Sequence, residues 1–199
     1  NVGLMPDIDS VPFIIAREKG YFSEEGVEVT LHQFKSAMDR DAAFQSGQLD
    51  GEVSDLLAAA FAKAGGFEVK VTSATDGAYQ MIAGKGVSAG DVRGLEGAEI
   101  AVSRNTIIDY VTDRILKENG MESGALNKIS VPQIPARLEM LQNGKLPAAT
   151  LPEPMASVAV ANGCRYLTGS RELGINPGVM LFSAKAVTEK KDALHRMYR

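Results

Sequence analysis

The sequence predicts an α/β protein of two lobes, each a mostly parallel sheet flanked by helices. Strand-like runs alternate with helix-like runs of roughly ten residues, which is the pattern of parallel βαβ units. Two glycine-bearing crossovers, residues 84–86 and 168–178, flank a complete middle block. Because domain boundaries fall in such exposed linkers, we expect a discontinuous first lobe, residues 1–84 and 175–199, and an inserted second lobe, residues 85–174.

The opening stretch, residues 2–29, contains a short apolar strand, a polar turn, a helix and a second strand. Ser10 stands where a helix N-cap belongs, and Gly20 stands where the same helix should end. Ile14 and Ile15 are expected to face the sheet. In an open α/β sheet, this order places the polar turn at the carboxyl edge, where ligands bind.

Strands and helices continue to alternate in the rest of the first lobe. The alanine-rich run 58–62 favours a helix packed closely on a sheet. We expect strands over residues 27–31, 51–53, 68–73 and 80–83, and helices over residues 39–45 and 55–63.

The alternation starts again after the first crossover, without any visible sequence repeat. Three helices end at Asn-Gly pairs, which are typical helix stops. We expect strands over residues 99–102, 128–131, 148–151, 165–167 and 179–183, and helices over residues 107–118, 136–142, 154–161 and 188–199.

Composition excludes several classes of protein. The chain has 199 residues, of which 45% are hydrophobic and 23% charged, as in ordinary globular proteins. A net charge of −4 and the absence of tryptophan argue against a nucleic-acid partner. The single cysteine, Cys164, allows no internal disulfide, and we expect it to be a small buried residue before a strand. The chain begins with a strand under way and stops inside a helical pattern, so we expect a signal segment and a further C-terminal portion outside it.

The sequence shows no recognisable catalytic or metal-binding motif. The two histidines, His32 and His195, are far apart and have no cysteine or spaced carboxylate pair nearby. No nucleophile elbow or phosphate-binding glycine loop is present. We therefore expect no enzyme activity, no cofactor and no metal.

Polar turns are the remaining candidates for function, because each follows a strand and precedes a helix or crossover. The carboxyl ends of parallel strands share one edge of a sheet, so these turns should gather there. Several of their side chains could instead cap helices, and Met5 and Met38 are expected in the core. The candidate ligand-binding residues are Asp9, Ser10, Ser36, Ala37, Met38, Ser54, Asp55, Thr75, Asp76, Asn105, Thr106 and Glu153.

The order of several short segments resembles periplasmic substrate-binding proteins of ABC importers. The similarity is to the branch that includes nitrate, sulfonate and taurine binders and the NMT1/THI5-like proteins. The matching segments are Pro12, Ala16, residues 20–22, Gly26, residues 27–29, SGQLD at 46–50, residues 95–102 and LPEP at 151–154.

This resemblance implies a type II periplasmic-binding-protein fold, with two α/β lobes hinged around a cleft. It also implies a monomeric, non-enzymatic protein in the periplasm or on the cell surface as a lipoprotein, which delivers a small solute to a membrane ABC permease. Helix N-termini favour an anion such as a nitrate or sulfonate group. The carboxylates at the same turns favour an amine or a heterocyclic N–H, as in a thiamine-precursor pyrimidine. The alternatives are an enzyme on the same fold, of the thiamine-pyrimidine or menaquinone biosynthesis type, and the sensing domain of a larger regulator.

Overall fold

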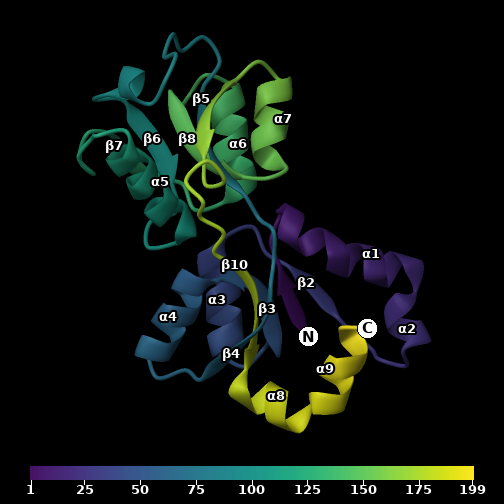
Figure 1. The fold of residues 1–199 in the computed structure, drawn as a ribbon. Helices are drawn as coiled ribbons and strands as arrows, with labels where there is room; N and C mark the ends of the chain where they lie inside the picture. Colours follow the sequence, from purple (N-terminus) through teal and green to yellow (C-terminus); the bar gives the residue numbers. More distant parts are fainter. The chain divides into compact units, whose positions relative to one another are not determined.

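The computed structural model describes residues 1–199, which form two compact units. Unit 1 contains Asn1–Met5, Asp9–Asp76 and Pro177–Arg199, and unit 2 contains Pro6–Ile8 and Gly77–Asn176. Each unit is a five-stranded sheet with helices on both faces (Figure 1).

The sheet of unit 1, sheet A, has the strand order β2-β1-β3-β10-β4. Strands β1, β2, β3 and β4 run in one direction, and β10 runs antiparallel to its neighbours β3 and β4. The strands are β1 (Val2–Leu4), β2 (Leu31–Gln33), β3 (Gly51–Asp55), β4 (Val69–Ala74) and β10 (Gly178–Ser183). The helices are α1 (Val11–Lys19), α2 (Tyr21–Glu24), α3 (Ala37–Gln45), α4 (Leu56–Ala64), α8 (Ala184–Glu189) and α9 (Lys191–Met197). A 3-10 turn, η1 (Ile8–Ser10), begins at the last residue of the unit 2 segment Pro6–Ile8 and continues into unit 1.

The core of unit 1 has two parts because β10 alternates its side chains between the two faces. Val179 and Leu181 pack with Phe44 of α3 on one face. Met180 and Phe182 pack on the other face with residues of α1, α8 and α9. Both faces of sheet A are therefore buried, as expected for a mostly parallel sheet.

The sheet of unit 2, sheet B, has the order β7-β6-β8-β5-β9, and only β5 is antiparallel to its neighbours. The strands are β5 (Tyr79–Ala83), β6 (Glu99–Val102), β7 (Asn127–Ser130), β8 (Ala148–Pro152) and β9 (Arg165–Gly169). The helices are α5 (Ile107–Glu118), α6 (Ile134–Gln142) and α7 (Met155–Ala161), with a 3-10 turn η2 at Arg93–Leu95. Helix α5 supplies Val111 and Ile115 to the main cluster of this unit, and α6 contacts α7 and β8.

The structure differs from the expected elements in four places. Strand β2 begins only at Leu31, because β1 is three residues long and pairs with that segment alone. The last expected helix is two helices, α8 and α9, which meet at Lys190. Ile15 is 48% exposed, so it does not face the sheet. Strand β5 pairs with β8 and β9 in sheet B, so the chain enters unit 2 at Gly77 and not at residues 84–86.

Candidate functional site

The carboxyl edge of sheet A collects the polar turns of unit 1. Strands β1, β2, β3 and β4 end at this edge, and each is followed by one of the predicted turns. The structure separates the predicted residues of this unit into a buried and an exposed or half-buried set. The buried set is Asp9, Ser10, Ser36, Ser54 and Asp55, and the other set is Ala37, Met38, Thr75 and Asp76.

Two members of the buried set cap helices. The Ser36 hydroxyl accepts a hydrogen bond from the Asp39 amide at 3.2 Å at the start of α3. The Asp55 carboxylate accepts from the Ala58 amide at 2.9 Å at the start of α4. These side chains satisfy helix amides that would otherwise have no partner, so they hold the edge in shape.

Ser10 precedes α1 as predicted but does not cap that helix with its side chain. Its hydroxyl accepts from the Met5 amide at 3.0 Å, because residues 8–10 form a 3-10 turn that directs the side chain back to the end of β1. Gly20 ends α1 in the left-handed conformation, with φ of 81°, as its position predicted. Met5 is buried as expected, whereas Met38 is 60% exposed and lies outside the core.

Beneath this edge lies a buried ionic group that the sequence reading missed. Arg40 of α3 is 4% exposed and donates to the Val53 carbonyl at 2.9 Å and to the Asp41 carboxylate at 2.6 Å. Its Nε also lies 3.2 Å from the Glu52 carboxylate. Burial raises the pKa of Glu52 to about 7, and burial raises the pKa of Asp55 as well. Three carboxyl groups therefore surround a single guanidinium, which leaves an excess of acid below the carboxyl edge of unit 1.

The carboxyl edge of sheet B collects the predicted residues of unit 2. Thr106 is buried, caps α5 by accepting from the Ile108 amide at 3.3 Å, and donates to the Ser103 carbonyl at 2.7 Å. Asn105 is exposed and has φ of 58°, a left-handed conformation that asparagine tolerates better than most residues. The backbone N–H of Asn105 donates to the Asp109 carboxylate at 3.1 Å.

Glu153 follows β8 and is engaged by residues of its own unit. Its carboxylate accepts from the Gln80 amide nitrogen at 2.5 Å, and from the amide and hydroxyl of Ser157 at 3.1 and 3.0 Å. Its carbonyl accepts from the Ile8 amide at 2.7 Å. Gln80 and Ser157 were not predicted, and only the register of β5 against β8 shows that Gln80 lies beside this turn.

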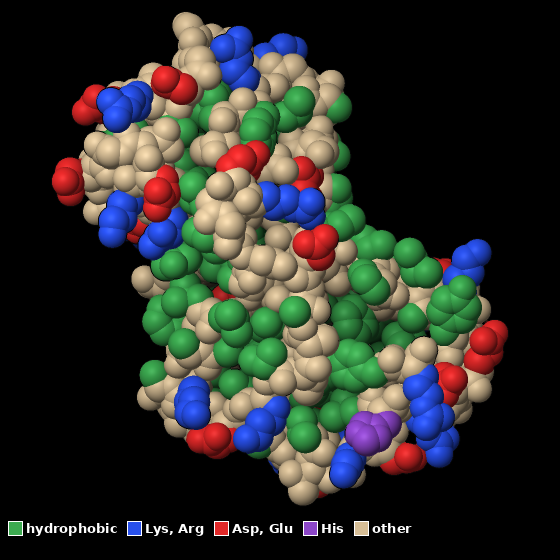
Figure 2. All heavy atoms as spheres, in the orientation of Figure 1, with side chains coloured by type: hydrophobic (Ala, Val, Ile, Leu, Met, Phe, Trp, Pro, Cys, Tyr) green, Lys and Arg blue, Asp and Glu red, His purple; other side chains and the backbone are tan.

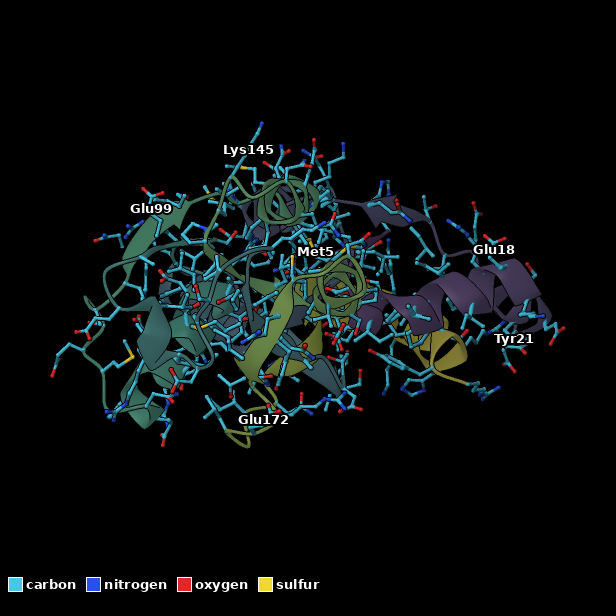
Figure 3. The ribbon with its side chains drawn as sticks, turned by 90° about the horizontal axis from the view of Figure 1, so that it is seen from above. Met5, Glu18, Tyr21, Glu99, Lys145 and Glu172 are labelled. Atoms are coloured by element: carbon cyan, nitrogen blue, oxygen red, sulfur yellow. The ribbon has the colours of Figure 1, made fainter.

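Loop residues beyond β9 add a second acidic contact near this turn. The Tyr166 hydroxyl donates to the Glu172 carboxylate, and Figure 3 labels Glu172 on the loop that follows β9. Burial and the charges of Glu172 and Glu153 raise the pKa of Tyr166 well above its ordinary value. Tyr166 therefore stays a neutral hydrogen-bond donor at this edge.

The features first set aside as structural remain away from both carboxyl edges. His32 lies in β2 with Nε2 2.9 Å from the Asn1 side-chain oxygen, and His195 lies on α9. Cys164 is buried directly before β9, and burial raises the pKa of its thiol. No group of three or more His, Cys, Asp or Glu side chains could hold a metal ion. No helix is long and apolar enough to cross a membrane.

A pocket of about 280 Å³ lies in unit 1 at the opposite, amino edge of sheet A. Asp50, Lys190, Leu194 and Met197 contribute to its lining. The Lys190 ammonium is 2.8 Å from the Asp50 carboxylate, so its main polar groups already pair with each other. The paired charges make this pocket a weaker candidate than the carboxyl edge.

The fold is that of the periplasmic binding proteins. The NMT1-like family model matches residues 1–199, so the chain belongs to the NMT1-like family. Among curated proteins, no sequence matches the chain.

Several solved structures share the fold at low sequence identity. The alkanesulfonate-binding protein SsuA from Xanthomonas axonopodis pv. citri, bound to MOPS, is 16% identical with a TM-score of 0.83, covering 98% of this chain and 70% of that one. The periplasmic nitrate-binding protein NrtA from Synechocystis PCC 6803 is 16% identical with a TM-score of 0.80, covering 98% and 58%. A nutrient-binding protein from Burkholderia cenocepacia, bound to methionine, is 16% identical with a TM-score of 0.66, covering 100% and 91%. These similarities establish the fold class that the sequence predicted.

Proposed function

We propose that this protein is the solute-binding component of an ABC importer, working outside the cytoplasm and handing a small organic solute to a membrane permease. The match to the NMT1-like family along the whole chain is the observation that carries this proposal. The proposal is supported by the similar folds of an alkanesulfonate-binding protein, a nitrate-binding protein and a nutrient-binding protein bound to methionine. The predicted residues at the carboxyl edges of the two sheets are the proposed binding residues.

The proposed residues divide into two roles. The buried caps, such as Ser36, Asp55 and Thr106, hold the turns in shape and leave neighbouring backbone groups at the edge. The exposed or half-buried side chains, such as Met38 in unit 1 and Asn105 in unit 2, are the ones available to a solute at the carboxyl edge of their own sheet. Met38 supplies an adaptable apolar surface, and the Asn105 amide supplies both a donor and an acceptor.

The excess of carboxyl groups beneath the carboxyl edge of sheet A indicates which class of solute unit 1 favours. Glu52, Asp55 and Asp41 outnumber Arg40, so the local potential disfavours a bare anion at this edge. We infer that the solute presents an N–H donor to unit 1, as an amine or an aminopyrimidine does. Among the expected solutes, a thiamine-precursor pyrimidine or an amine-bearing sulfonate fits this better than nitrate.

A thermal-shift screen tests the proposal. Taurine, aminopyrimidines, simple sulfonates and nitrate are added to the protein, and a binder of the native state should raise Tm by mass action. For the best compound, Met38→Ala and Asn105→Gly should weaken Kd about tenfold, the loss of roughly 1.4 kcal/mol of binding free energy. Glycine suits the left-handed conformation at position 105, so the unliganded Tm should stay close to that of the wild type.

A matched control uses Lys145→Ala. Lys145 is exposed between α6 and β8, at the amino edge of sheet B, and is labelled in Figure 3. Its removal should leave Kd unchanged. The proposal fails if no compound shifts Tm, or if Lys145→Ala weakens binding as much as the two edge variants do.

A further inference from the structure

The pocket at the amino edge of sheet A is separate from the proposed solute site. It has a volume of about 280 Å³ and lies between the segment of residues 27–30 and helix α9 (Figure 1). The proposed binding residues of unit 1 follow the opposite, carboxyl ends of the strands. The length of sheet A therefore separates the two places.

The interior of the pocket is apolar. Val2 of β1 and Phe182 of β10 contribute to it from the sheet, and both are almost completely buried. Leu194 and Met197 lie about one turn apart on α9, and they pack with Val29 against the same buried cluster. A molecule in this pocket can therefore bury an apolar body against aliphatic and aromatic carbons, which favours binding.

Hydrogen bonds hold two sides of the pocket in place. The Thr30 carbonyl accepts from the Val2 amide at 2.9 Å, which fixes the end of the segment 27–30. The Tyr198 hydroxyl, directly after α9, lies 2.6 Å from the Thr72 hydroxyl of β4. The pocket is thus formed before a ligand arrives, so binding requires little ordering of the chain.

Lys190 supplies a charged donor to the pocket. Its ammonium donates to both oxygens of the Asp50 carboxylate, at 2.8 and 2.9 Å. An ammonium group has three N–H donors, so one remains for a ligand, whereas both carboxylate oxygens are already engaged. The Lys190 side chain is 50% exposed, so this donor can turn toward an incoming molecule. The ligand is therefore expected to present an acceptor, and a carboxylate makes the strongest hydrogen bond to an ammonium group.

The remaining acid at the pocket does not oppose such a ligand. Glu28 contributes to the lining but is exposed, and its neighbours Val27 and Val29 are half-buried. The Glu28 carboxylate therefore lies in water, where solvent and salt screen its charge.

The volume of the pocket limits the size of the ligand. An apolar cavity of about 150 Å³ holds one benzene molecule. A pocket of about 280 Å³ therefore has room for about two fused aromatic rings, or for an alkyl chain of similar volume.

We propose that unit 1 binds a small monocarboxylate in this pocket, with its apolar body against Val2, Leu194 and Met197 and its carboxylate at the Lys190 ammonium. The site does not rest on the proposed transport role. Every lining residue belongs to unit 1, and none is among the proposed solute-binding residues.

Isothermal titration calorimetry with 1-naphthoate tests the proposal on the 199-residue protein. The uncharged 1-naphthalenemethanol shares the two rings and lacks the carboxylate. Wild-type protein should bind one naphthoate, with Kd about tenfold below that for the alcohol, which corresponds to roughly 1.4 kcal/mol. Absence of naphthoate binding, or equal Kd values for the two probes, overturns the proposal.

Ala193→Phe tests whether the probe occupies this pocket. Ala193 is a half-buried lining residue of α9, so a phenyl ring there should fill the space and abolish naphthoate binding. Its unliganded Tm should equal or exceed that of the wild type, because the ring fills an existing cavity. Ala60→Phe, the matched control, makes the same change at an exposed position of α4 outside the lining and should keep the wild-type Kd. Wild-type binding by Ala193→Phe overturns the site.

Lys190→Gln tests the head group at an exposed position where the fold should tolerate the change. It should weaken naphthoate binding about tenfold and leave the Kd of the alcohol unchanged. Lys185→Gln, on the exposed surface of α8, is the matched control and should bind both probes as the wild type does.

A double variant separates the donor role of Lys190 from its pairing with Asp50. Lys190→Gln leaves the Asp50 carboxylate without its lysine partner, and that carboxylate alone could repel naphthoate. With Asp50→Asn added, naphthoate binding should stay weak, because the donor is still missing. Recovery of the wild-type Kd in the double variant would show that Lys190 only neutralises Asp50, and it would overturn the proposal.

Discussion

The two units share a backbone plan but fill it differently. In each, an antiparallel strand that continues from the other unit, β10 or β5, is inserted between the third and fourth parallel strands. The irregular step in this pairing falls at the same register, between Met180 and Leu181 in unit 1 and between Met81 and Ile82 in unit 2. The sequences do not show this repeat, because a shared strand order requires only matching apolar periodicity and turns.

The units differ in two respects: the size of the side chains at one strand pair, and the partners of one buried arginine. In unit 1, Gly51 lies opposite Phe182, and in unit 2 Ala148 lies opposite Ala83 at the same register. The large ring is accommodated only because its partner has no side chain. The second difference concerns charge. Arg40, the fourth residue of α3, has carboxylate partners in unit 1, and its counterpart Arg137, the fourth residue of α6 in unit 2, has none. The side-chain volumes thus match within each unit, whereas the buried guanidinium has carboxylate partners in unit 1 only.

The largest expected effect on the free energy of unfolding comes from changing the side-chain volumes at Gly51 and Phe182. A Cβ on Gly51 would lie 2.5 Å from the Phe182 ring and 2.6 Å from the Leu181 carbonyl, so Gly51→Ala should destabilise the protein by about 3 kcal/mol. Phe182→Ala should cost about 4 kcal/mol by leaving a cavity. The double variant copies unit 2 and should cost at least 1 kcal/mol less than the sum of the single variants, because the added methyl group enters the space left by the ring.

Chemical unfolding of the four proteins in a double-mutant cycle measures this coupling. Ala148→Gly is the matched control in unit 2, where no large side chain opposes the position. Strict additivity of Gly51→Ala and Phe182→Ala would contradict the proposed exchange of volume.

The next effect comes from the buried Glu52 carboxyl beside Arg40, and it depends on pH. Burial raises the pKa of Glu52 to about 7 from its ordinary 4.5. The folded protein therefore holds this proton more tightly than the unfolded chain. The stability that the protonated carboxyl contributes is fully present below pH 4.5 and is lost as the pH rises through 7. We expect the free energy of unfolding to fall by roughly 3 kcal/mol across this window, at about 1.4 kcal/mol per pKa unit.

Glu52→Gln should flatten most of this pH dependence, because glutamine does not titrate. Glu99→Gln, which changes an exposed acid at the start of β6, should leave the curve unaltered. Urea unfolding at intervals between pH 4 and pH 8 gives the comparison. An unchanged slope in Glu52→Gln would show that Asp55, whose pKa burial also raises, carries the effect instead.

The smallest effect concerns the equivalent helices α3 and α6. Ser36 caps α3, whereas the side chain of Gln133, the N-cap residue of α6, makes no capping hydrogen bond. Ser36→Ala should cost about 1 kcal/mol, and Gln133→Ser should gain up to about 1 kcal/mol by supplying the missing acceptor. Gln133→Ala controls for the loss of glutamine, and equal stability of the two Gln133 variants would show that α6 gains nothing from a cap.

Surface charge does not distinguish the units in the same way. Figure 2 shows Lys and Arg side chains interspersed with Asp and Glu over the visible surface of each unit. The units differ in their buried charges. The sequence does not show this difference, because charged residues are scattered along the chain and only the structure shows which of them are buried.

Periodicity and turn chemistry determined much of the fold. The alternation of strands and helices, the left-handed Gly20 and the caps at Ser36 and Asp55 follow from local residue preferences. Local preference also suggested a cap at Ser10, but the close return of that turn to β1 gave its hydroxyl another donor, Met5. Met38 was expected in the core because methionine is apolar, yet its place in the first turn of α3 leaves it exposed.

The sequence by itself determined the fold class, the family resemblance and the turns that follow the strands, because these depend on the order of neighbouring residues. Only the tertiary structure decided which sheet receives β5, which carboxylates surround Arg40 and which contact Arg137 lacks. These properties arise from pairings between residues distant along the chain, and only strand register and burial reveal them. The polar turns were thus predictable, whereas the buried charges beneath them were not.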